Sequence, residues 1–196
     1  MAQLGGVHPR SLTNMEDGTF SVAELESKVR EDDPHLPVTQ LVAIENTHNK
    51  CGGVCLPLPW LEEVGAACKR LGLPLHCDGA RLLNAAVSQG VEVSALLRHC
   101  DSASICLSKV REPSQAQSDL SLLQGLGCPV GSVIVGSRPL IEKAIRLRKV
   151  LGGAMRQSGV LAAAGLFALE HNVARLEQDH RHATEMAEII NQVSRQ

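Results

Sequence analysis

Aromatic residues are scarce in this sequence: of its 196 residues, one is Trp, two are Phe and none is Tyr. Proteins that bind single-stranded nucleic acid stack the bases on aromatic side chains, so this composition argues against that function. The formal net charge of −2 provides no basic surface for nucleic acid or for an anionic membrane. No apolar run approaches the roughly 20 residues that a membrane-spanning helix needs. We therefore expect a protein that binds neither nucleic acid nor membranes.

The seven cysteines form no recognisable pattern for disulfides or for a metal. Their odd number, with no C-x-x-C pair and no N-terminal signal peptide, favours free thiols in a reducing compartment, and we expect a cytoplasmic protein. Cys51 and Cys55 with His48 match the spacing of no common zinc site, so we expect no bound metal. Four cysteines lie in apolar runs and are expected to pack as small hydrophobic residues: Cys68, Cys77, Cys106 and Cys128.

Apolar runs and helical patterns alternate along the chain, and 44% of its residues are hydrophobic. This alternation is typical of an α/β fold in which a mostly parallel sheet has helical crossovers. At this length the chain can bury a core as one domain. The predicted strands cover residues 40–45, 74–77, 102–107 and 132–135. The predicted helices cover residues 22–30, 58–71, 81–88, 138–150 and 158–175; the last is apolar and Ala-rich, which predicts that it is buried.

Ionisable residues follow two of these predicted strands. Asp78 and Arg81 come after one strand, and Lys109 comes after the next. Ligands of open α/β sheets bind beyond the carboxyl ends of the strands, so we expect these side chains to share one edge of the sheet. They suit pyridoxal phosphate, which needs a Lys amine for a Schiff base and an acidic partner for its pyridinium nitrogen. The alternatives are a solvated Lys, an Asp that caps the next helix and an Arg in a surface ion pair.

The blocks around these residues, taken in their order, resemble the low-specificity threonine aldolases. These enzymes belong to the β-eliminating lyase branch of the pyridoxal-phosphate enzymes with the aminotransferase-like (type I) fold. Each block alone is a weak signal, but the ordered set extends over nearly the whole chain. The blocks are DPH at 33–35, IENTHN at 44–49, DGAR at 78–81 with NAA at 84–86, CLSK at 106–109, GLGCPVGS at 125–132, RK at 148–149, GGAMRQ at 152–157 and AAAG at 162–165.

The resemblance implies a retro-aldol cleavage of L-threonine or L-allo-threonine to glycine and acetaldehyde, in amino acid catabolism, by a homodimer or homotetramer. Lys109 would form the Schiff base, Asp78 would pair with the pyridinium nitrogen, and Arg81 would contact the cofactor oxygen or the substrate carboxylate. His35 would take the proton of the substrate β-hydroxyl, the alternative being a loop His with no role. Arg156, in a glycine-containing block, would bind the phosphate, which in a symmetric dimer includes that of the neighbouring subunit.

The sequence departs from the family pattern in three places. Residues 110–124 separate Lys109 from the block that follows it directly in the family, and we interpret them as an inserted, exposed loop. The family's N-terminal phosphate-binding turn with its ring-stacking His, and its C-terminal small domain with a carboxylate-binding Arg, are not found. We therefore expect a partial large domain at 1–160, followed by a long helix at 161–196 that leads towards a truncated small domain. We also expect the chain alone to have little activity. The alternatives are an impaired isoform that keeps the core fold and another type I amino acid lyase.

Overall fold

The computed structural model describes residues 2–109 and 126–193, and in these residues the chain forms one four-stranded sheet. The strands lie in the order β1 (Val42–Glu45), β2 (Leu75–Gly79), β3 (Ser102–Cys106) and β4 (Ser132–Gly136). Neighbouring strands among the first three are parallel, and β4 runs antiparallel to β3. The predicted α/β fold with a mostly parallel sheet is therefore confirmed. The inserted loop expected at 110–124 lies outside the described residues.

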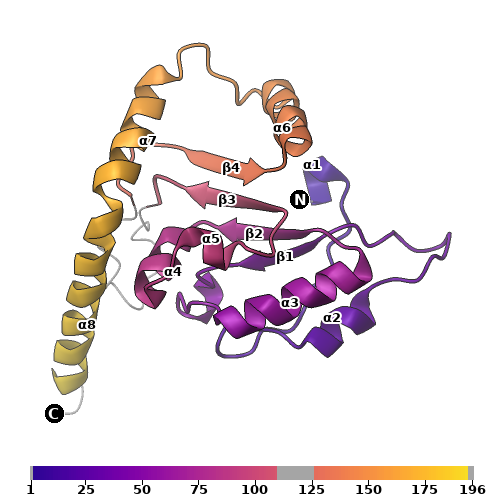
Figure 1. The fold of residues 1–196 in the computed structure, drawn as a ribbon, viewed down its shortest axis with the longest axis horizontal. Coiled ribbons are helices and arrows are strands. Elements are labelled where there is room, and N and C mark those ends of the chain that lie inside the picture. Colours follow the sequence, from indigo (N-terminus) through magenta and orange to yellow (C-terminus); the bar gives the residue numbers. More distant parts are fainter. Residues whose placement is uncertain (1, 110–125, 194–196) are drawn as a thin grey trace.

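Helices connect and flank the strands (Figure 1). Two of the predicted helices have the predicted bounds, at 58–71 and 138–150. No helix within the described ranges is both long and apolar enough to cross a membrane. In chain order the helices are α1 (Ala2–Gly5), α2 (Val22–Lys28), the 3₁₀ turn η1 (Asn49–Cys51), α3 (Leu58–Leu71), α4 (Leu82–Gln89), α5 (Val93–Leu96), α6 (Arg138–Val150), α7 (Gly159–His171), η2 (Val173–Arg175) and α8 (Leu176–Val193).

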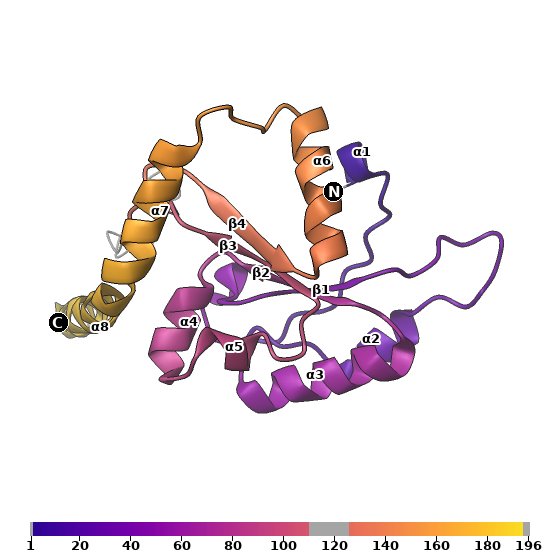
Figure 2. The ribbon, with the colours of Figure 1, turned by 45° about the horizontal axis from the view of Figure 1, so that its top comes forward.

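The main core lies between one face of the sheet and the helices α3, α4 and α5. Side chains alternate across a strand, so Val42, Ile44 and Cys77 point to the same face and are buried. Helix α3 meets them with an apolar stripe that includes Val64 and Cys68. Full burial of one such side chain contributes about 1.5–3 kcal/mol, so this layer holds the first three strands together. Figure 2 shows α3 and α5 together on this side of the sheet.

The opposite face of the sheet is largely open and carries the polar residues of the strands. Ala43 and Asp78 are exposed there, and Glu45, His76 and Ser104 are half-buried. Strand β4 is exposed along its whole length. The ionisable side chains of the sheet therefore lie on the face that the core helices leave uncovered.

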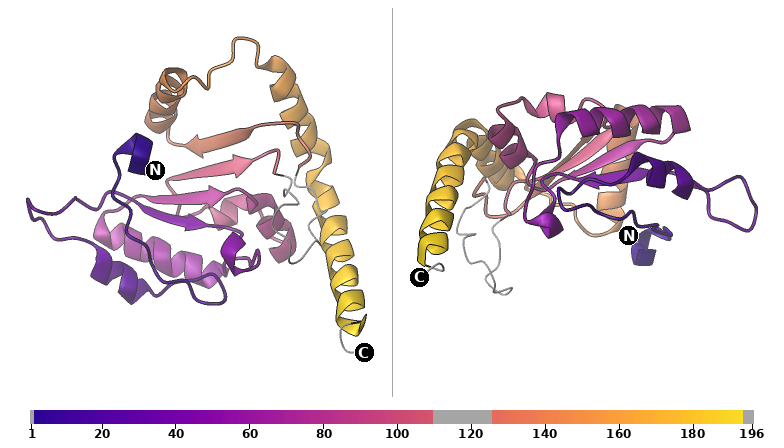
Figure 3. Two further views of the ribbon diagram at one scale, coloured as in Figure 1. Left: turned by 180° about the vertical axis from the view of Figure 1, so that it is seen from behind. Right: turned by 90° about the horizontal axis from the view of Figure 1, so that it is seen from below.

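The prediction of a single buried helix over 158–175 is wrong. Helix α7 ends at His171, and the chain continues through η2 into α8, which packs beside α4 and extends past the sheet (Figure 3). Only Gly165 and Ala168 of α7 are buried, whereas Val160 is 80% exposed. An apolar composition does not specify what covers a helix. In the described chain, only a small cluster around Leu107 packs against α7.

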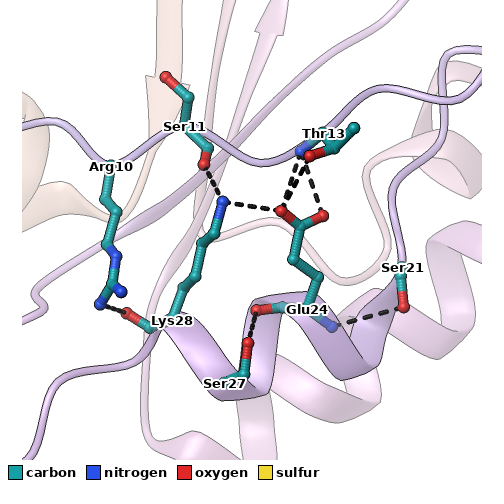
Figure 4. A network of polar contacts seen from close by, with 7 residues as sticks. All are labelled: Arg10, Ser11, Thr13, Ser21, Glu24, Ser27 and Lys28. Carbon is teal, nitrogen blue, oxygen red and sulfur yellow. Dashed lines mark hydrogen bonds and ion pairs between the residues drawn. The ribbon is translucent and has the colours of Figure 1, made fainter.

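A network of polar contacts ties the N-terminal segment to α2 (Figure 4). Ser21 begins the helix by accepting a hydrogen bond from the Glu24 backbone N–H, as its capping position predicts. The Glu24 carboxylate accepts hydrogen bonds from Thr13 and forms an ion pair of 2.7 Å with Lys28. The contact with Lys28 is the main reason that the pKa of Glu24 is lowered. These contacts fix the segment that leads into residues 14–20, of which Asn14, Gly18 and Phe20 line the pocket described next.

Candidate active site

The sheet brings Asp78 and Lys109 to the same edge. Asp78 lies near the end of β2, and Lys109 follows the last residue of the parallel strand β3 by three positions. Both side chains are exposed. Ser104, the register partner of Asp78 on β3, places its hydroxyl 3.5 Å from Asp78 Oδ1. This edge is the carboxyl edge of the parallel strands, where ligands of open α/β sheets bind.

Asp78 is fixed in the turn between β2 and α4. Its Oδ1 accepts a hydrogen bond of 3.2 Å from the Ala80 backbone N–H, and its backbone carbonyl accepts one of 3.0 Å from Asn46. Helix α4 begins after Arg81, which occupies the N-cap position without a side-chain hydrogen bond. The alternative role of Asp78 as the cap of this helix is therefore wrong, and its carboxylate is directed to the open face.

Arg81 lies beside the segment that follows β1. Its Nη1 donates a hydrogen bond of 3.2 Å to Asn49 Oδ1. Within the described residues it takes part in no ion pair, so the surface salt bridge considered for it is not observed. The side chain is half-buried, and Arg81 follows Asp78 by three residues.

Packing and backbone bonds around Leu107 hold the segment that carries Lys109. The Leu107 N–H donates to the Gly131 carbonyl at 3.0 Å, and its own carbonyl accepts from the Cys128 N–H at 3.1 Å. The buried side chain of Leu107 packs with Cys128 and Ala168. A Cβ added to Gly165 would lie 3.1 Å from Leu107 Cδ1, so α7 approaches this segment closely. Gly131, Cys128 and helix α7 therefore contact the segment that leads to Lys109.

His35 and Arg156 lie in exposed loops and do not directly follow a strand as Asp78 and Lys109 do. His35 is exposed in the loop 29–41, which leaves the sheet on the side where β1 begins (Figure 1). Its backbone N–H donates to Asp33 Oδ1 at 2.8 Å. Arg156 is exposed in the loop between α6 and α7. In the described chain no ion pair joins either side chain to Asp78, Arg81 or Lys109.

A pocket of about 340 Å³ opens beside Asp78. Asn14, Glu45, His48 and Trp60 also line it. His48 is 9% exposed, and its Nδ1 is buried with no hydrogen-bond partner in the described residues. The sequence analysis did not select Glu45 and Trp60. Glu45 ends the predicted strand 40–45, but the sequence does not show that it pairs with Asp78 across the sheet. No signal in the sequence marked Trp60, which lies in helix α3.

Metal ligation is not supported by the described part of the chain, where no group of three or more His, Cys, Asp or Glu residues is arranged to hold an ion. All seven cysteines are free. Cys51 and Cys55, considered with His48, are half-buried, and the Cys51 thiol donates to the Met15 carbonyl. Burial raises the pKa of the Cys68 thiol to about 11, as expected for a cysteine that packs as a hydrophobic residue.

Comparison with known proteins places the chain in a family. The sequence model of the β-eliminating lyases matches residues 1–111 and 117–196. Low-specificity L-threonine aldolase 1 of Arabidopsis thaliana is 46% identical over 195 residues, which are 98% of this chain and 50% of that protein. The low specificity L-threonine aldolase of Escherichia coli K12 is 44% identical over 191 residues, 97% of this chain and 52% of that protein.

A solved structure shows the same fold. The threonine aldolase of Leishmania major superposes with a TM-score of 0.66 at 25% identity, covering 90% of this chain and 47% of that one. The chain thus spans about half the length of the relatives it matches. Because the family model matches nearly all of its residues and the ordered blocks agree, this chain belongs to the β-eliminating lyase family.

Proposed function

We propose that this chain carries the cofactor-binding centre of a pyridoxal-phosphate-dependent lyase that cleaves L-threonine or L-allo-threonine to glycine and acetaldehyde. The observation that supports this most directly is that Asp78 and Lys109 follow the ends of neighbouring parallel strands, where Asp78 lines a pocket. The relatives named as threonine aldolases supply the substrate class. The activity belongs to amino acid catabolism, and we propose a cytoplasmic location for it.

The residues at this edge fit the ring end of pyridoxal phosphate. Asp78 offers an ionisable oxygen next to the pocket, and no ion pair in the described chain occupies it. Lys109 offers an exposed amine on the neighbouring strand end. His48 adds a buried nitrogen without a partner in the same pocket. Polar groups that converge on a pocket without satisfying one another are typical of a binding site.

Lys109, Asp78 and Arg81 have distinct tasks in the proposed reaction. Bound pyridoxal phosphate supplies an electron sink for the bond that breaks at the substrate Cα. Lys109 would hold the cofactor through its amine before substrate arrives. Asp78 would accept a hydrogen bond from the ring nitrogen and so favour its protonated form. Arg81 offers a guanidinium, whose planar fork matches the substrate carboxylate.

His35 is the proposed base for the β-hydroxyl proton of the substrate. In the described chain it is exposed in the loop 29–41, which leads into the start of β1, whereas Lys109 follows the end of β3. We therefore infer that His35 acts at the site of a neighbouring subunit, in a homodimer or homotetramer. The exposed Arg156 is assigned in the same way to the phosphate of a neighbouring site.

A second candidate function is cofactor binding without turnover. It is favoured by the observation that the described chain brings only Asp78, Arg81 and Lys109 to the edge, while His35 and Arg156 lie elsewhere. Loss of one preorganised group commonly costs about 10²–10³ in rate. On this basis the chain alone releases little acetaldehyde, although it keeps the cofactor-binding residues.

The absorption spectrum of the purified chain with pyridoxal phosphate tests the proposal. The wild type should develop the visible-edge band of Lys-bound cofactor, and Lys109→Ala should lose it. Lys143→Ala removes an exposed Lys from α6 and should keep the band. Acetaldehyde release from L-allo-threonine then separates the two candidates. A wild-type spectrum identical to that of Lys109→Ala would show that Lys109 does not hold the cofactor.

A further inference from the structure

Glu45 and Asp78 are carboxylates placed side by side on the open face of the sheet. The two residues are register partners on the parallel strands β1 and β2. Register partners on neighbouring strands point to the same face of a sheet, and neighbouring strands lie about 4.7–4.9 Å apart. Both residues line the 340 Å³ pocket. Two like charges in this arrangement repel each other. A cation bound next to the pair would relieve that repulsion.

The described chain supplies no such cation to Glu45 and Asp78. None of its ion pairs involves Glu45 or Asp78. His76 lies on the same face, but burial lowers the pKa of its imidazole, so it favours the neutral form. Arg81, the nearest cation in the sequence, donates to Asn49.

His48 provides an independent indication that the pocket receives a ligand. Its side chain is nine-tenths buried in the pocket lining, and its Nδ1 has no hydrogen-bond partner in the described residues. Gly18 packs directly against it, because a Cβ at Gly18 would lie 2.9 Å from His48 Cβ. The backbone N–H and carbonyl of His48 are both bonded, to Val54 and Gly53. His48 is therefore held in place by its backbone. A buried polar atom without a hydrogen-bond partner costs free energy unless a ligand supplies that partner.

We propose that Glu45 is a second carboxylate for the cationic ring nitrogen of the cofactor, so that Glu45 and Asp78 together select a pyridinium over an uncharged ring. The proposal rests on the proposed function, because it concerns the same pocket. It adds a binding residue on β1 to the Asp78 carboxylate on β2. It also accounts for two neighbouring carboxylates being held next to a pocket with no protein cation between them.

Trp60 supplies the means of testing this. It is the only Trp of the chain, and it lines the same pocket, so its fluorescence should report occupation directly. The probe is 4′-deoxypyridoxine 5′-phosphate, which lacks the aldehyde and cannot react with Lys109. The comparison probe is its benzene analogue, in which the ring nitrogen is replaced by C–H. Binding of both is titrated by quenching of Trp60 emission.

We expect Glu45→Gln to weaken binding of the pyridine probe about tenfold, because a charge a few ångströms from the ring nitrogen is removed. Binding of the benzene analogue should change less than about twofold, since it carries no ring charge. Glu45→Asp, which keeps the charge, should retain the preference for the pyridine probe. Glu92→Gln is the matched control, because it removes a charge from an exposed position outside the pocket, and it should bind both probes as the wild type does.

Two outcomes would overturn the role of Glu45. One is unchanged affinity of Glu45→Gln for the pyridine probe. The other is an equal loss of affinity for both probes, which would indicate a purely structural effect. Either result leaves the proposed function standing if the Lys109 band is present. Absence of quenching by the pyridine probe in the wild type would overturn this inference, and absence of the Lys109 band as well would overturn the proposed function.

Discussion

At the scale of single residues, the open face of the sheet shows how neighbours set the charge of a side chain. His76 Nδ1 lies 2.8 Å from Ser102 Oγ on the adjacent strand. Burial lowers the pKa of His76, and the negative charge of Asp78 opposes that effect more weakly. The imidazole is therefore stabilised in its neutral form beside a carboxylate, which leaves the charge of Asp78 available to a ligand.

We expect His76→Gln to reduce the loss of stability at acid pH. The unfolded chain binds a proton at His76 near its ordinary pKa of 6.5, whereas the folded chain binds it only at lower pH. Stability from this residue is thus present above pH 6.5 and is lost as the pH falls through the lowered folded value. Urea unfolding at about pH 7.5 and about pH 5 measures this. Gln can still bond Ser102, so the wild type should lose more stability than the variant; equal losses would contradict the assigned cause.

At the scale of elements, local signals were sufficient where the end of a helix is determined by the chain itself. Helix α3 ends as predicted at Gly72, which adopts a φ of 66° and donates its N–H to the carbonyls of Cys68 and Lys69. Asp78 and Lys109 were also predicted to share an edge, because both follow strands and parallel strands end together.

Elements whose environment depends on distant segments were not predictable in this way. The apolar composition of α7 gave its helical state but not its exposure, since what covers a helix is set by other elements. Glu45 was missed because its importance comes from its register with Asp78, which the sequence does not display. The roles of His35 and Arg156 came from family resemblance alone, and their positions in the described chain depend on long-range arrangement.

The packing of α3 against the loop after α5 gives a prediction at this scale. Gly65 is buried in α3, and an added Cβ would clash with His99 Cβ. We expect Gly65→Ala to destabilise the fold by about 1–3 kcal/mol, as overpacking does, and to lower the thermal midpoint by several degrees. Gly159→Ala is the control, because nothing lies within 4 Å of its Cβ position. A Gly65→Ala midpoint equal to that of the control would show that the loop yields without cost.

At the scale of the whole molecule, burial is unevenly distributed. The main core lies among β1, β2, β3 and the helices α2 to α5. Strand β4 and helix α6 have no buried residues. The accessible surface is 13650 Å², whereas a compact monomer of this mass exposes about 9,000 Å². The excess includes exposed apolar side chains of β4 and α6, such as Val133, Ile134 and Leu147, and these two elements therefore offer an apolar surface for association.

The outer edge of β4 should therefore drive self-association of the purified chain. Its residues Ser132–Gly136 carry no charge and no Pro, and the sheet order leaves this edge unpaired in the described chain. Edges of this kind pair with other chains unless a charge prevents it. Ile134 is 46% exposed, so Ile134→Lys should cost little stability while placing a charge on that edge.

Sedimentation velocity over about a tenfold range of concentration tests this prediction. The wild type should show an average mass that rises above 20.9 kDa with concentration, and Ile134→Lys should remain near that value. Val38→Lys is the matched control, since Val38 is 65% exposed in the loop 29–41, away from β4; it should associate as the wild type does. If Val38→Lys suppressed association as strongly as Ile134→Lys, net charge would be the cause. A monomeric wild type at every concentration would show that the exposed edge is tolerated in water without a partner.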